Sequence, residues 1–336
     1  MTKIAIVGEA WGEAEERERA PFVGPAGWTL NKMLKEAGIE RAHCYLTNVF
    51  NLRPKPSNDI ENLCSSEKVG GYPALRAGKY VKAEYLGEVA RLHNELRRVN
   101  PNLTILLGNT AAWALLGNTG ISKIRGTVCY STVIPSLKCL PTYHPAAILR
   151  QWGLRPITIL DFIKAARECE FPEVRRPRRT VYIEPTLADL EWYYDNFLRN
   201  ARRITFDIET AGSQITCIGF APDDKSALVI PFVDYRKEGC SYWTSGSDEL
   251  KAWNFVARVL DLQTPKVAQN GLYDMHFLWR GYGITVRNFE DDTMLLHHAL
   301  QPESEKGLAF LGSVYTNEAS WKMMRQRGKT TIKRDE

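Results

Sequence analysis

Long hydrophobic runs are absent from this sequence. No apolar stretch reaches the roughly 18 residues typical of a membrane-spanning helix, and the best candidate, 103–121, is interrupted by Asn109, Thr110 and Asn118. The N-terminal residues MTKIAIVGEAWG are typical of a strand and a turn, which argues against a secretory signal peptide. We therefore expect no membrane association and a cytoplasmic location.

Cysteine patterning and a strong net charge are absent as well. The seven cysteines are an odd number and include no Cys-x-x-Cys motif, which favours a reduced compartment over a disulfide framework. The 44 Lys and Arg residues exceed the 39 Asp and Glu residues by only five. Such a mild basic excess permits nucleic-acid binding but does not require it.

What is present is an ordinary globular composition. Hydrophobic residues make up 44% and charged residues 25% of the chain, which excludes disorder, collagen and coiled coil. At roughly 150 residues per domain, the 336 residues predict two domains. The clearest boundary is FPEVRRPRRT, which combines two prolines with four arginines. We expect one domain at 1–172, an Arg/Pro-rich linker at 173–180 and a second domain at 181–336.

The first half alternates between strand-like and helix-like segments. The segment WTLNKMLKEAG predicts a helix, because Leu30, Met33, Leu34 and Ala37 fall on one of its faces. Short apolar runs predict four strands, at 3–7, 44–49, 103–107 and 138–143. This alternation predicts an α/β domain with a parallel sheet between helices, an αβα sandwich, whose ligands bind beyond the carboxyl ends of the strands.

The second half shows a different spacing. A strand at 181–183 and a helix that begins after Thr186 come first. Short turns then separate three apolar runs, which predicts an antiparallel meander over 204–208, 215–220 and 227–232. Helices are expected near 247–260, 271–281 and 292–300. The second half is therefore expected to be α/β with a mixed sheet.

Three polar or aromatic residues of the first half follow predicted strands or lie in the loops between them. Phe22 offers a flat stacking face, and the Asn48 amide offers both a donor and an acceptor to the edge of a base. His144 can donate to a carbonyl oxygen that gains charge during a reaction. Taken singly, each has an ordinary alternative, because Asn commonly forms turns and His before Pro is commonly structural.

Together, the motifs of the first half resemble the uracil-DNA glycosylase superfamily, and most closely its family 4 branch. The resemblance runs from Ile4 to about Arg167 and includes GEAxGxxEE, PFVGxAG, YLTNV, ILLGNTAAWALLG and HPAAILR. It implies a base-flipping pocket that accepts uracil. It also implies that Phe22 stacks on the base, Asn48 reads its Watson–Crick edge and His144 contacts a ring carbonyl. Glu9 and Glu15 become the acidic candidates for positioning water or stabilising the sugar cation.

The first half also departs from the family 4 pattern. Trp11 stands where the family usually has Pro, and Ala10 where the best-studied branch has Asp. Family 4 carries four cysteine ligands for an iron–sulfur cluster, but Cys44 and Cys64 alone cannot complete a four-thiolate site. We expect no iron–sulfur cluster. The alternative to retained uracil recognition is a domain that kept the fold, lost excision and holds DNA.

The motif FDIET is the sharpest short signal in the second half. Asp207 and Glu209 are two positions apart, so a strand places both carboxylates on one face, where they suit divalent cations. Alone, such a pair is more often a solvated strand face. The motif QNGLYD adds Asp274 in the first turn of a predicted helix, from which it can point toward the same site.

These two motifs resemble those of DEDD-type 3′–5′ exonucleases, and 181–332 resembles family A polymerase proofreading domains. The resemblance implies a mixed-sheet, ribonuclease H-like fold. Asp207, Glu209 and Asp274 become catalytic ligands for Mg²⁺ or Mn²⁺, and Asn270 contacts substrate. Asp292 is expected instead to cap a helix. The third family motif requires a Tyr with an Asp four residues on, yet no Tyr follows Tyr315, and 330–336 lies about where that motif would begin. Slow or absent exonuclease activity is expected without a completing chain.

The order of the two regions resembles the N-terminal part of certain bacteriophage DNA polymerases. This predicts a DNA replication or repair protein, a DNA-acting hydrolase that works on single strands or 3′ ends, in the host cytoplasm if phage-encoded. A separate polymerase chain is an expected partner. Two alternatives stay open: a non-catalytic DNA-binding subunit of a split polymerase, and a free-standing uracil-DNA glycosylase with a vestigial exonuclease tail.

Overall fold

The computed structural model describes residues 2–318, so the expected start of the third exonuclease motif at 330–336 lies outside the described residues. The chain divides into two compact units. The first unit comprises the residues up to Arg176 together with those from Ala309 onward, and the second unit comprises Pro177–Leu308. The described residues 309–318 therefore group with the first unit, whereas the sequence-based limits assign them to the second domain.

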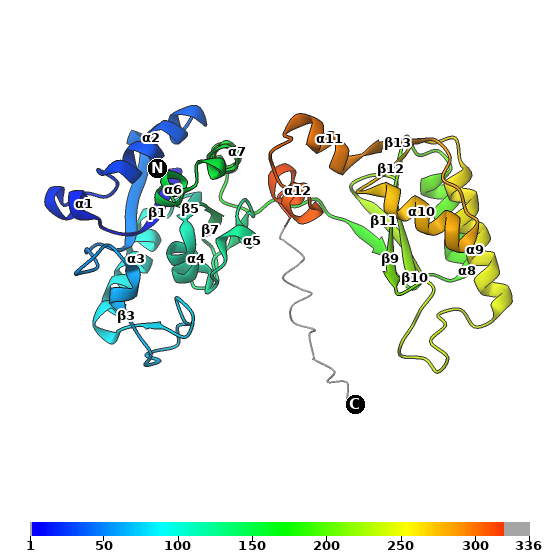
Figure 1. The fold of residues 1–336 in the computed structure, drawn as a ribbon, viewed down its shortest axis with the longest axis horizontal. Helices are drawn as coiled ribbons and strands as arrows, with labels where there is room; N and C mark the ends of the chain where they lie inside the picture. Colours follow the sequence, from blue (N-terminus) through cyan, green and yellow to red (C-terminus); the bar gives the residue numbers. More distant parts are fainter. Residues whose placement is uncertain (1, 319–336) are drawn as a thin grey trace. The chain divides into compact units, whose positions relative to one another are not determined.

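The first unit is built on a five-stranded sheet with the order β2-β1-β5-β7-β6 (Figure 1). The four expected strands are confirmed and run parallel: β1 (Ile4–Ala10), β2 (Cys44–Phe50), β5 (Leu103–Leu107) and β7 (Lys138–Thr142). The fifth strand, β6 (Cys129–Tyr130), is antiparallel to β7. This strand was not predicted, because two residues are too few to show a periodicity.

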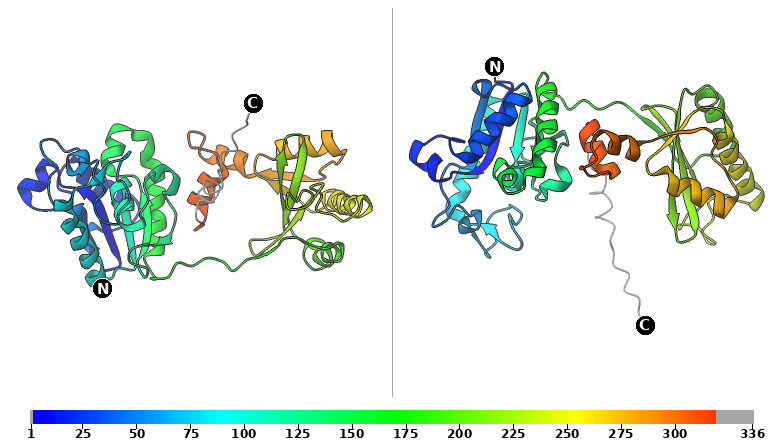
Figure 2. Two further views of the ribbon diagram at one scale, coloured as in Figure 1. Left: turned by 90° about the horizontal axis from the view of Figure 1, so that it is seen from below. Right: turned by 45° about the horizontal axis from the view of Figure 1, so that its top comes forward.

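Helices cover both faces of this sheet, as expected (Figure 2). Alternation along β1 explains why: Ile4 and Ile6 enter one core cluster, and Ala5 and Val7 enter the other. The first cluster includes residues of α2 (Pro25–Glu36), α6 (Pro145–Arg150) and α7 (Arg155–Glu168). The second includes residues of α3 (Leu86–Val99) and α4 (Gly108–Leu116).

Shorter elements complete the first unit. Its remaining α-helices are α1 (Glu13–Glu18), α5 (Ile121–Ile124) and α12 (Leu308–Tyr315), the last of which begins at the unit boundary. A small hairpin pairs β3 (Cys64–Ser65) with β4 (Tyr80–Val81). Single 3₁₀ turns occupy Arg41–His43, Ile60–Leu63, Ala83–Tyr85 and Trp152–Leu154.

The second unit contains a six-stranded sheet with the order β13-β12-β9-β10-β11-β8 (Figure 1). The expected antiparallel meander is confirmed as β9 (Ile204–Ala211), β10 (Gln214–Ala221) and β11 (Ser226–Pro231). The other strands run parallel to their neighbours: β8 (Thr180–Tyr182), β12 (Lys266–Ala268) and β13 (Phe289–Asp292). The sheet is therefore mixed.

The helices of the second unit follow the expected positions. They are α8 (Leu187–Tyr193), which continues into a π turn at Tyr194–Leu198, then α9 (Gly246–Asp261), α10 (Gly271–Tyr282) and α11 (Thr293–Leu300). Thr186 caps α8 through its side chain, as its position before the helix predicts. Within residues 2–318, none of the helices has both the length and the apolar character needed to cross a bilayer.

Burial along β9 decides where the second unit presents its acidic residues. Ile204, Phe206 and Ile208 belong to the hydrophobic core. Asp207 and Glu209 alternate with these residues and are exposed. The strand therefore directs its carboxylates away from the core, because successive side chains point to opposite faces of a sheet.

Candidate active sites

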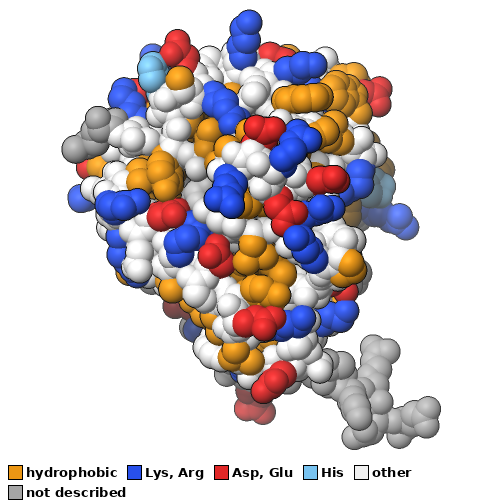
Figure 3. Space-filling model, turned by 90° about the vertical axis from the view of Figure 1, so that its left-hand side faces the viewer, with side chains coloured by type: hydrophobic (Ala, Val, Ile, Leu, Met, Phe, Trp, Pro, Cys, Tyr) orange, Lys and Arg blue, Asp and Glu red, His pale blue; other side chains and the backbone are white. Residues whose placement is uncertain are grey.

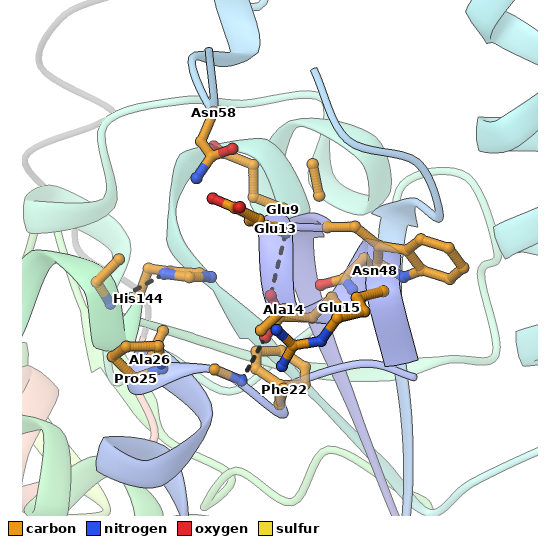
Figure 4. A pocket seen from close by; sticks show the side chains of 16 residues that line it. Glu9, Glu13, Ala14, Glu15, Phe22, Pro25, Ala26, Asn48, Asn58 and His144 are labelled. Carbon is orange, nitrogen blue, oxygen red and sulfur yellow. Dashed lines mark hydrogen bonds between the residues drawn. The ribbon is translucent and has the colours of Figure 1, made fainter. Parts of the chain in front are cut away.

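A cavity of about 440 Å³ lies where β1 and β2 end in the first unit. Figure 4 shows its lining side chains around a common space. All five residues proposed from the sequence line it: Glu9, Glu15, Phe22, Asn48 and His144. The parallel sheet brings them together, because loops after parallel strands meet at one edge.

Gly8 allows two of these side chains to close on the strand. A Cβ atom at Gly8 would lie 2.3 Å from Asn48 Oδ1 and 2.5 Å from Phe22 Cζ. Phe22 itself is only 5% exposed and has a left-handed backbone, with φ of 56°. Gly27 permits that backbone to approach α2, since a Cβ there would lie 1.9 Å from the Phe22 carbonyl oxygen. The two glycines thus set the depth of the cavity.

Asn48 is held through its main chain. Its carbonyl oxygen accepts a hydrogen bond of 2.8 Å from Arg91 Nη2. Arg91 is in turn held by ion pairs of 3.0 Å to Glu88 and 2.7 Å to Glu95. Asn48 is only 2% exposed. Anchoring of the backbone leaves the amide side chain at the cavity wall, where it can present a donor and an acceptor to a base.

His144 occupies the N-cap position of α6, and this fixes the state of its ring. The Ala146 amide donates to His144 Nδ1 at 3.1 Å, so the proton of a neutral ring must be on Nε2. Burial lowers the pKa of His144, which favours that neutral form. The ring centroid lies 6.4 Å from that of Phe22. A neutral imidazole so placed can donate an N–H to an oxygen that becomes negative.

The two acidic candidates have different surroundings. The Glu15 carboxylate accepts backbone N–H groups from Gly12 at 3.1 Å, Val23 at 3.0 Å and Gly24 at 2.8 Å. It therefore organises the loop that carries Phe22. Glu9 instead accepts a short hydrogen bond from the Thr110 hydroxyl. Sequence reasoning missed the structural role of Glu15, although an acid three residues after an N-cap is a readable capping signal.

A second cavity of about 660 Å³ shares Glu9, Asn58 and His144 with the first. It extends past two basic side chains that the sequence did not single out, Arg76 and Arg150. Figure 3 shows basic and acidic side chains interspersed on one face of the molecule. The charge on that face is not segregated into a broad basic patch, so individual basic side chains near the cavities become the candidates for phosphate contact.

The cysteines do not fit an iron–sulfur cluster. Such a cluster needs four converging thiolates, yet within residues 2–318 no three His, Cys, Asp or Glu side chains form a group able to hold a metal. Cys44 and Cys64 both belong to strands, and burial raises the pKa of Cys44 to about 11, which opposes thiolate formation. The absence of a cluster stays a prediction for the purified protein.

In the second unit, Asp274 is tied to the strand that carries Asp207 and Glu209. Its Oδ1 accepts the Ile208 amide at 2.9 Å, and the side chain is only 3% exposed. β12 pairs with β9 only at Ile204 and Thr205, so β9 extends beyond its pairing with β12. In this unpaired part, the Asp274 carboxylate takes the place of a strand partner for the Ile208 amide. Burial, reinforced by the charge of Asp207, raises the pKa of Asp274 to about 6.

Asp292 has the capping role expected from the sequence. Its carboxylate accepts the amide of Met294 at 2.8 Å, which caps α11. It also accepts the amides of Asn270 at 3.0 Å and Gly271 at 2.8 Å, and so fixes the start of α10. Asn270 is left-handed, with φ of 59°. The carboxylate of Asp292 is thus engaged by three backbone donors.

The donor chemistry of the second unit suits a hard cation. Carboxylate oxygens are the ligands that Mg²⁺ and Mn²⁺ prefer. Asp207 and Glu209 flank Ile208 in the strand, and Asp274 accepts the hydrogen bond of its amide. Nevertheless, among the residues that the structure describes, no three such side chains converge closely enough to form a metal centre. One oxygen of Asp274 is already engaged by the Ile208 amide. The structure therefore places the three residues near one strand segment without assembling a complete site.

Comparison with known proteins identifies the family of the first unit. The uracil DNA glycosylase superfamily model matches residues 1–167. The type-4 uracil-DNA glycosylase of Archaeoglobus fulgidus is 33% identical over 174 residues, covering 50% of this chain and 77% of that protein. The type-4 enzyme of Thermotoga maritima is 31% identical over 168 residues, covering 49% and 76%. The chain belongs to the uracil-DNA glycosylase superfamily, and these relatives within it are type-4 enzymes.

The second half adds a different domain. A 3′–5′ exonuclease family model matches residues 185–334. The DNA polymerase of Bacillus phage SP01 is 23% identical over 323 residues, covering 88% of this chain and 32% of the polymerase. A solved EXD2 exonuclease domain soaked in Mg and GMP is 16% identical, covering 40% of this chain and 68% of that chain, with a TM-score of 0.27.

These matches confirm several expectations. The fold is α/β, with a mostly parallel sheet in the glycosylase-like half and a mixed sheet in the exonuclease-like half. The protein is a DNA-acting hydrolase with a role in DNA replication or repair. Its substrate is nucleic acid. The roles of individual residues, the metal and a partner polymerase chain stay predictions.

Proposed function

We propose that the first unit excises uracil from DNA. The flipped base would enter the 440 Å³ cavity, stack on Phe22 and pair its edge with the Asn48 amide. The observation that carries this proposal is the hydrogen bond from the Ala146 amide to His144 Nδ1, which leaves Nε2 as the position for the proton of a neutral ring. Unstacking a base costs a few kcal/mol, which stacking and edge hydrogen bonds in the pocket offset.

The proposed chemistry assigns each group one task. The bond between N1 of uracil and C1′ of the sugar breaks, and its electron pair leaves with the base. Negative charge collects on a ring carbonyl oxygen, to which His144 Nε2 donates. Water then adds to C1′, and the proton that it loses passes to the uracil anion, which leaves as the neutral base. Glu9 is the acid proposed to orient that water, because the Glu15 carboxylate is already engaged by three amides.

Release of uracil tests this function. The protein is incubated with a uracil-containing oligonucleotide and its thymine counterpart, and alkali then cleaves any abasic site. We expect scission of the uracil strand alone, and Asn48→Asp should abolish it because the amide donor is lost. Asn94→Asp is the matched control, since Asn94 is exposed on α3 and far along the chain from the pocket motifs. If the unaltered protein produces no scission, uracil excision is excluded and the alternative of a DNA-holding domain is favoured.

We propose, second, that the other unit hydrolyses DNA from its 3′ end with Mg²⁺ or Mn²⁺. Asp207, Glu209 and Asp274 would hold the metal, and Asn270 would contact the substrate. The supporting observation is the hydrogen bond from Ile208 to Asp274, which ties α10 to the carboxylate-bearing strand. A bound divalent ion would activate water and stabilise the leaving oxygen.

Degradation of an end-labelled single strand tests this second function. We expect cleavage that depends on added Mg²⁺ or Mn²⁺ and that Asp207→Ala abolishes. Asp224→Ala is the control, because Asp224 is an exposed acid in a turn of the same unit. The same assay repeated with a polymerase chain that carries a Tyr-x-x-x-Asp motif measures whether a partner raises the rate. If activity survives Asp207→Ala, this assignment of the metal ligands is wrong.

The polymerase match spans both units, and this favours a role at the front of a phage-type replication polymerase. Such a protein would work on single strands or 3′ ends in the host cytoplasm, with a polymerase chain as its partner. The two assays separate this reading from its alternatives. Uracil release without exonuclease activity under any condition favours a free-standing glycosylase, and neither activity favours a non-catalytic DNA-binding subunit.

A further inference from the structure

Two buried basic side chains of the first unit contact a segment that is distant in sequence. Arg125 is 3% exposed and pairs with the buried carboxylate of Asp161. Its Nη1 also donates to the Ser313 hydroxyl at 2.7 Å. Lys164 is 4% exposed and donates to the carbonyl oxygens of Gly126 at 2.9 Å, Thr316 at 2.7 Å and Ser313. The segment 309–318 thus supplies much of their polar environment.

Further contacts extend along the same segment. Asn317 Nδ2 donates to Glu168 Oε1 at 2.7 Å. The guanidinium of Arg125 lies 5.6 Å from the centre of the Phe310 ring, within reach of a cation–π interaction. The contacts therefore run from the beginning of α12 to the residues after its end, and they are made by α7 and by the two residues that follow α5.

Gly126 shows how closely the segment approaches. Its φ is 71°, and a Cβ atom there would lie 2.8 Å from both the Ser313 carbonyl oxygen and Asp161 Oδ1. Real Cβ contacts are essentially never that short, so a side chain at residue 126 would displace either the segment or the buried carboxylate. The absence of a side chain at Gly126 therefore makes room for a segment that lies nearly 190 residues later in the same chain.

Removal of the segment would take away hydrogen bonds made by these two cations. Lys164 would keep one of its three carbonyl acceptors, and Arg125 would lose the Ser313 hydroxyl. Buried charges without hydrogen-bond partners are strongly destabilising. Burial already lowers the pKa of Lys164 to about 8.

We infer that Arg125, Gly126, Asp161, Lys164 and Glu168 form a docking site on the first unit whose occupant is the chain's own segment 309–318. The segment is thus an integral part of the glycosylase-like unit, although it lies within the range matched by the exonuclease family. This inference does not depend on either proposed activity.

The docking site also reaches the strand that precedes the pocket histidine. Asp161 Oδ2 accepts both Arg125 Nε at 2.9 Å and the Thr142 hydroxyl at 2.6 Å. Thr142 ends β7, two residues before His144. The docked segment is therefore connected through Arg125 and Asp161 to the end of the strand that precedes His144.

Cleavage of the connection tests the inference directly. A site for a specific protease is inserted after Pro302 in the full chain, within the exposed stretch that precedes α12. After cleavage, the piece beginning at residue 303 is joined to the rest by no covalent bond. We expect it to co-elute with the remainder on size exclusion at micromolar concentration. If the two pieces of the cleaved protein separate although the docking site carries no substitution, the inference is wrong.

Three variants locate the contact. Gly126→Ala should reduce retention about tenfold or more, because overpacking at a tight contact is costly. Gly120→Ala is the control: its φ is 96°, but no atom lies within 4 Å of its added Cβ, so it carries the backbone strain without meeting the segment. Ser313→Lys alters only the released piece and places a third cation beside Arg125 and Lys164, so retention should again fall. Equal retention in all variants would show that the piece binds elsewhere.

Discussion

Gly8 and Asn48 lie directly opposite each other on the parallel strands β1 and β2, and a methyl group on Gly8 would come within 2.3 Å of Asn48 Oδ1. The cavity of the first unit is therefore shaped by a residue that has no side chain. Because Phe22 Cζ would lie 2.5 Å from the same methyl group, one added carbon would disturb both the stacking face and the amide.

Gly8→Ala should accordingly reduce the affinity for a uracil-containing single strand about tenfold or more, through overpacking at the cavity floor. Gly87→Ala on α3 serves as the control, since nothing lies within 4 Å of its added Cβ. Fluorescence anisotropy with uracil and thymine strands measures the effect. Unchanged uracil affinity in Gly8→Ala would mean that the base binds elsewhere.

The pH dependence of stability should report the burial of His144. The pKa of His144 is lowered in the folded protein, so the unfolded chain binds a proton at this residue more readily than the folded protein does. The stability contributed by the neutral His144 is therefore lost as the pH falls. His144→Gln cannot titrate. It should therefore lose less free energy of unfolding than the unaltered protein between about pH 7.5 and pH 5.5. Urea unfolding at both pH values makes the comparison, and parallel losses would contradict the assignment.

Glu15 should act as an organiser of the Phe22 loop. Glu15→Gln replaces one acceptor oxygen by an NH₂ group that cannot accept the amides now bound, so we expect a loss of about 1–3 kcal/mol in stability and weaker uracil binding. Glu13→Gln is the neighbouring control, because Glu13 is largely exposed. Thermal unfolding followed by strand-binding measurements distinguishes the two variants. A Glu15→Gln protein as stable as Glu13→Gln would rule out this role.

Asp274 should show separable structural and catalytic roles. Asp274→Asn keeps an acceptor for the Ile208 amide, whereas Asp274→Ala leaves that buried N–H without a partner, at a cost of about 1–3 kcal/mol. We expect Asn to preserve stability better than Ala, and both to abolish exonuclease activity. Denaturant unfolding and the end-label assay provide the two measurements. Equal stability of the variants would show that the hydrogen bond contributes little.

The purified protein should be colourless and free of stoichiometric iron and sulfide. Four thiolates do not converge within residues 2–318, where all seven cysteines lie. Metal analysis together with the visible absorption spectrum checks this. A brown protein with iron and sulfide in equal amounts would require the cysteines to adopt positions different from those described.

The repeating elements of the fold could be predicted from the sequence because their signals are local. Alternation of apolar residues located β9, and the side chains of Thr186 and Asp292 marked helix starts that the structure confirms. The short strand β6 escaped notice, since two residues give no period. Local sequence patterns thus predict helices and strands well when several residues contribute to the same periodicity.

The candidate sites were only partly predictable, since their contacts come from distant residues. The sequence indicated Phe22 and Asn48, but the need for Gly8 appears only when β1 and β2 pair. Glu15 was expected near the reacting sugar, whereas its carboxylate binds amides of the adjacent loop. The chemical type of a residue limits its possible roles, and its hydrogen-bond partners in the folded protein determine which of these roles it can take.

Membership of the segment 309–318 in the first unit makes the second unit an insertion rather than a simple C-terminal appendage. A single cut in the exposed 177–179 stretch would therefore leave the fragments joined through the docked segment. Conversely, a gene divided at that stretch would deprive the glycosylase-like half of residues 309–318, which supply hydrogen-bond partners to Arg125 and Lys164. As an independent module, this half would expose both cations to water unless another element took the place of that segment.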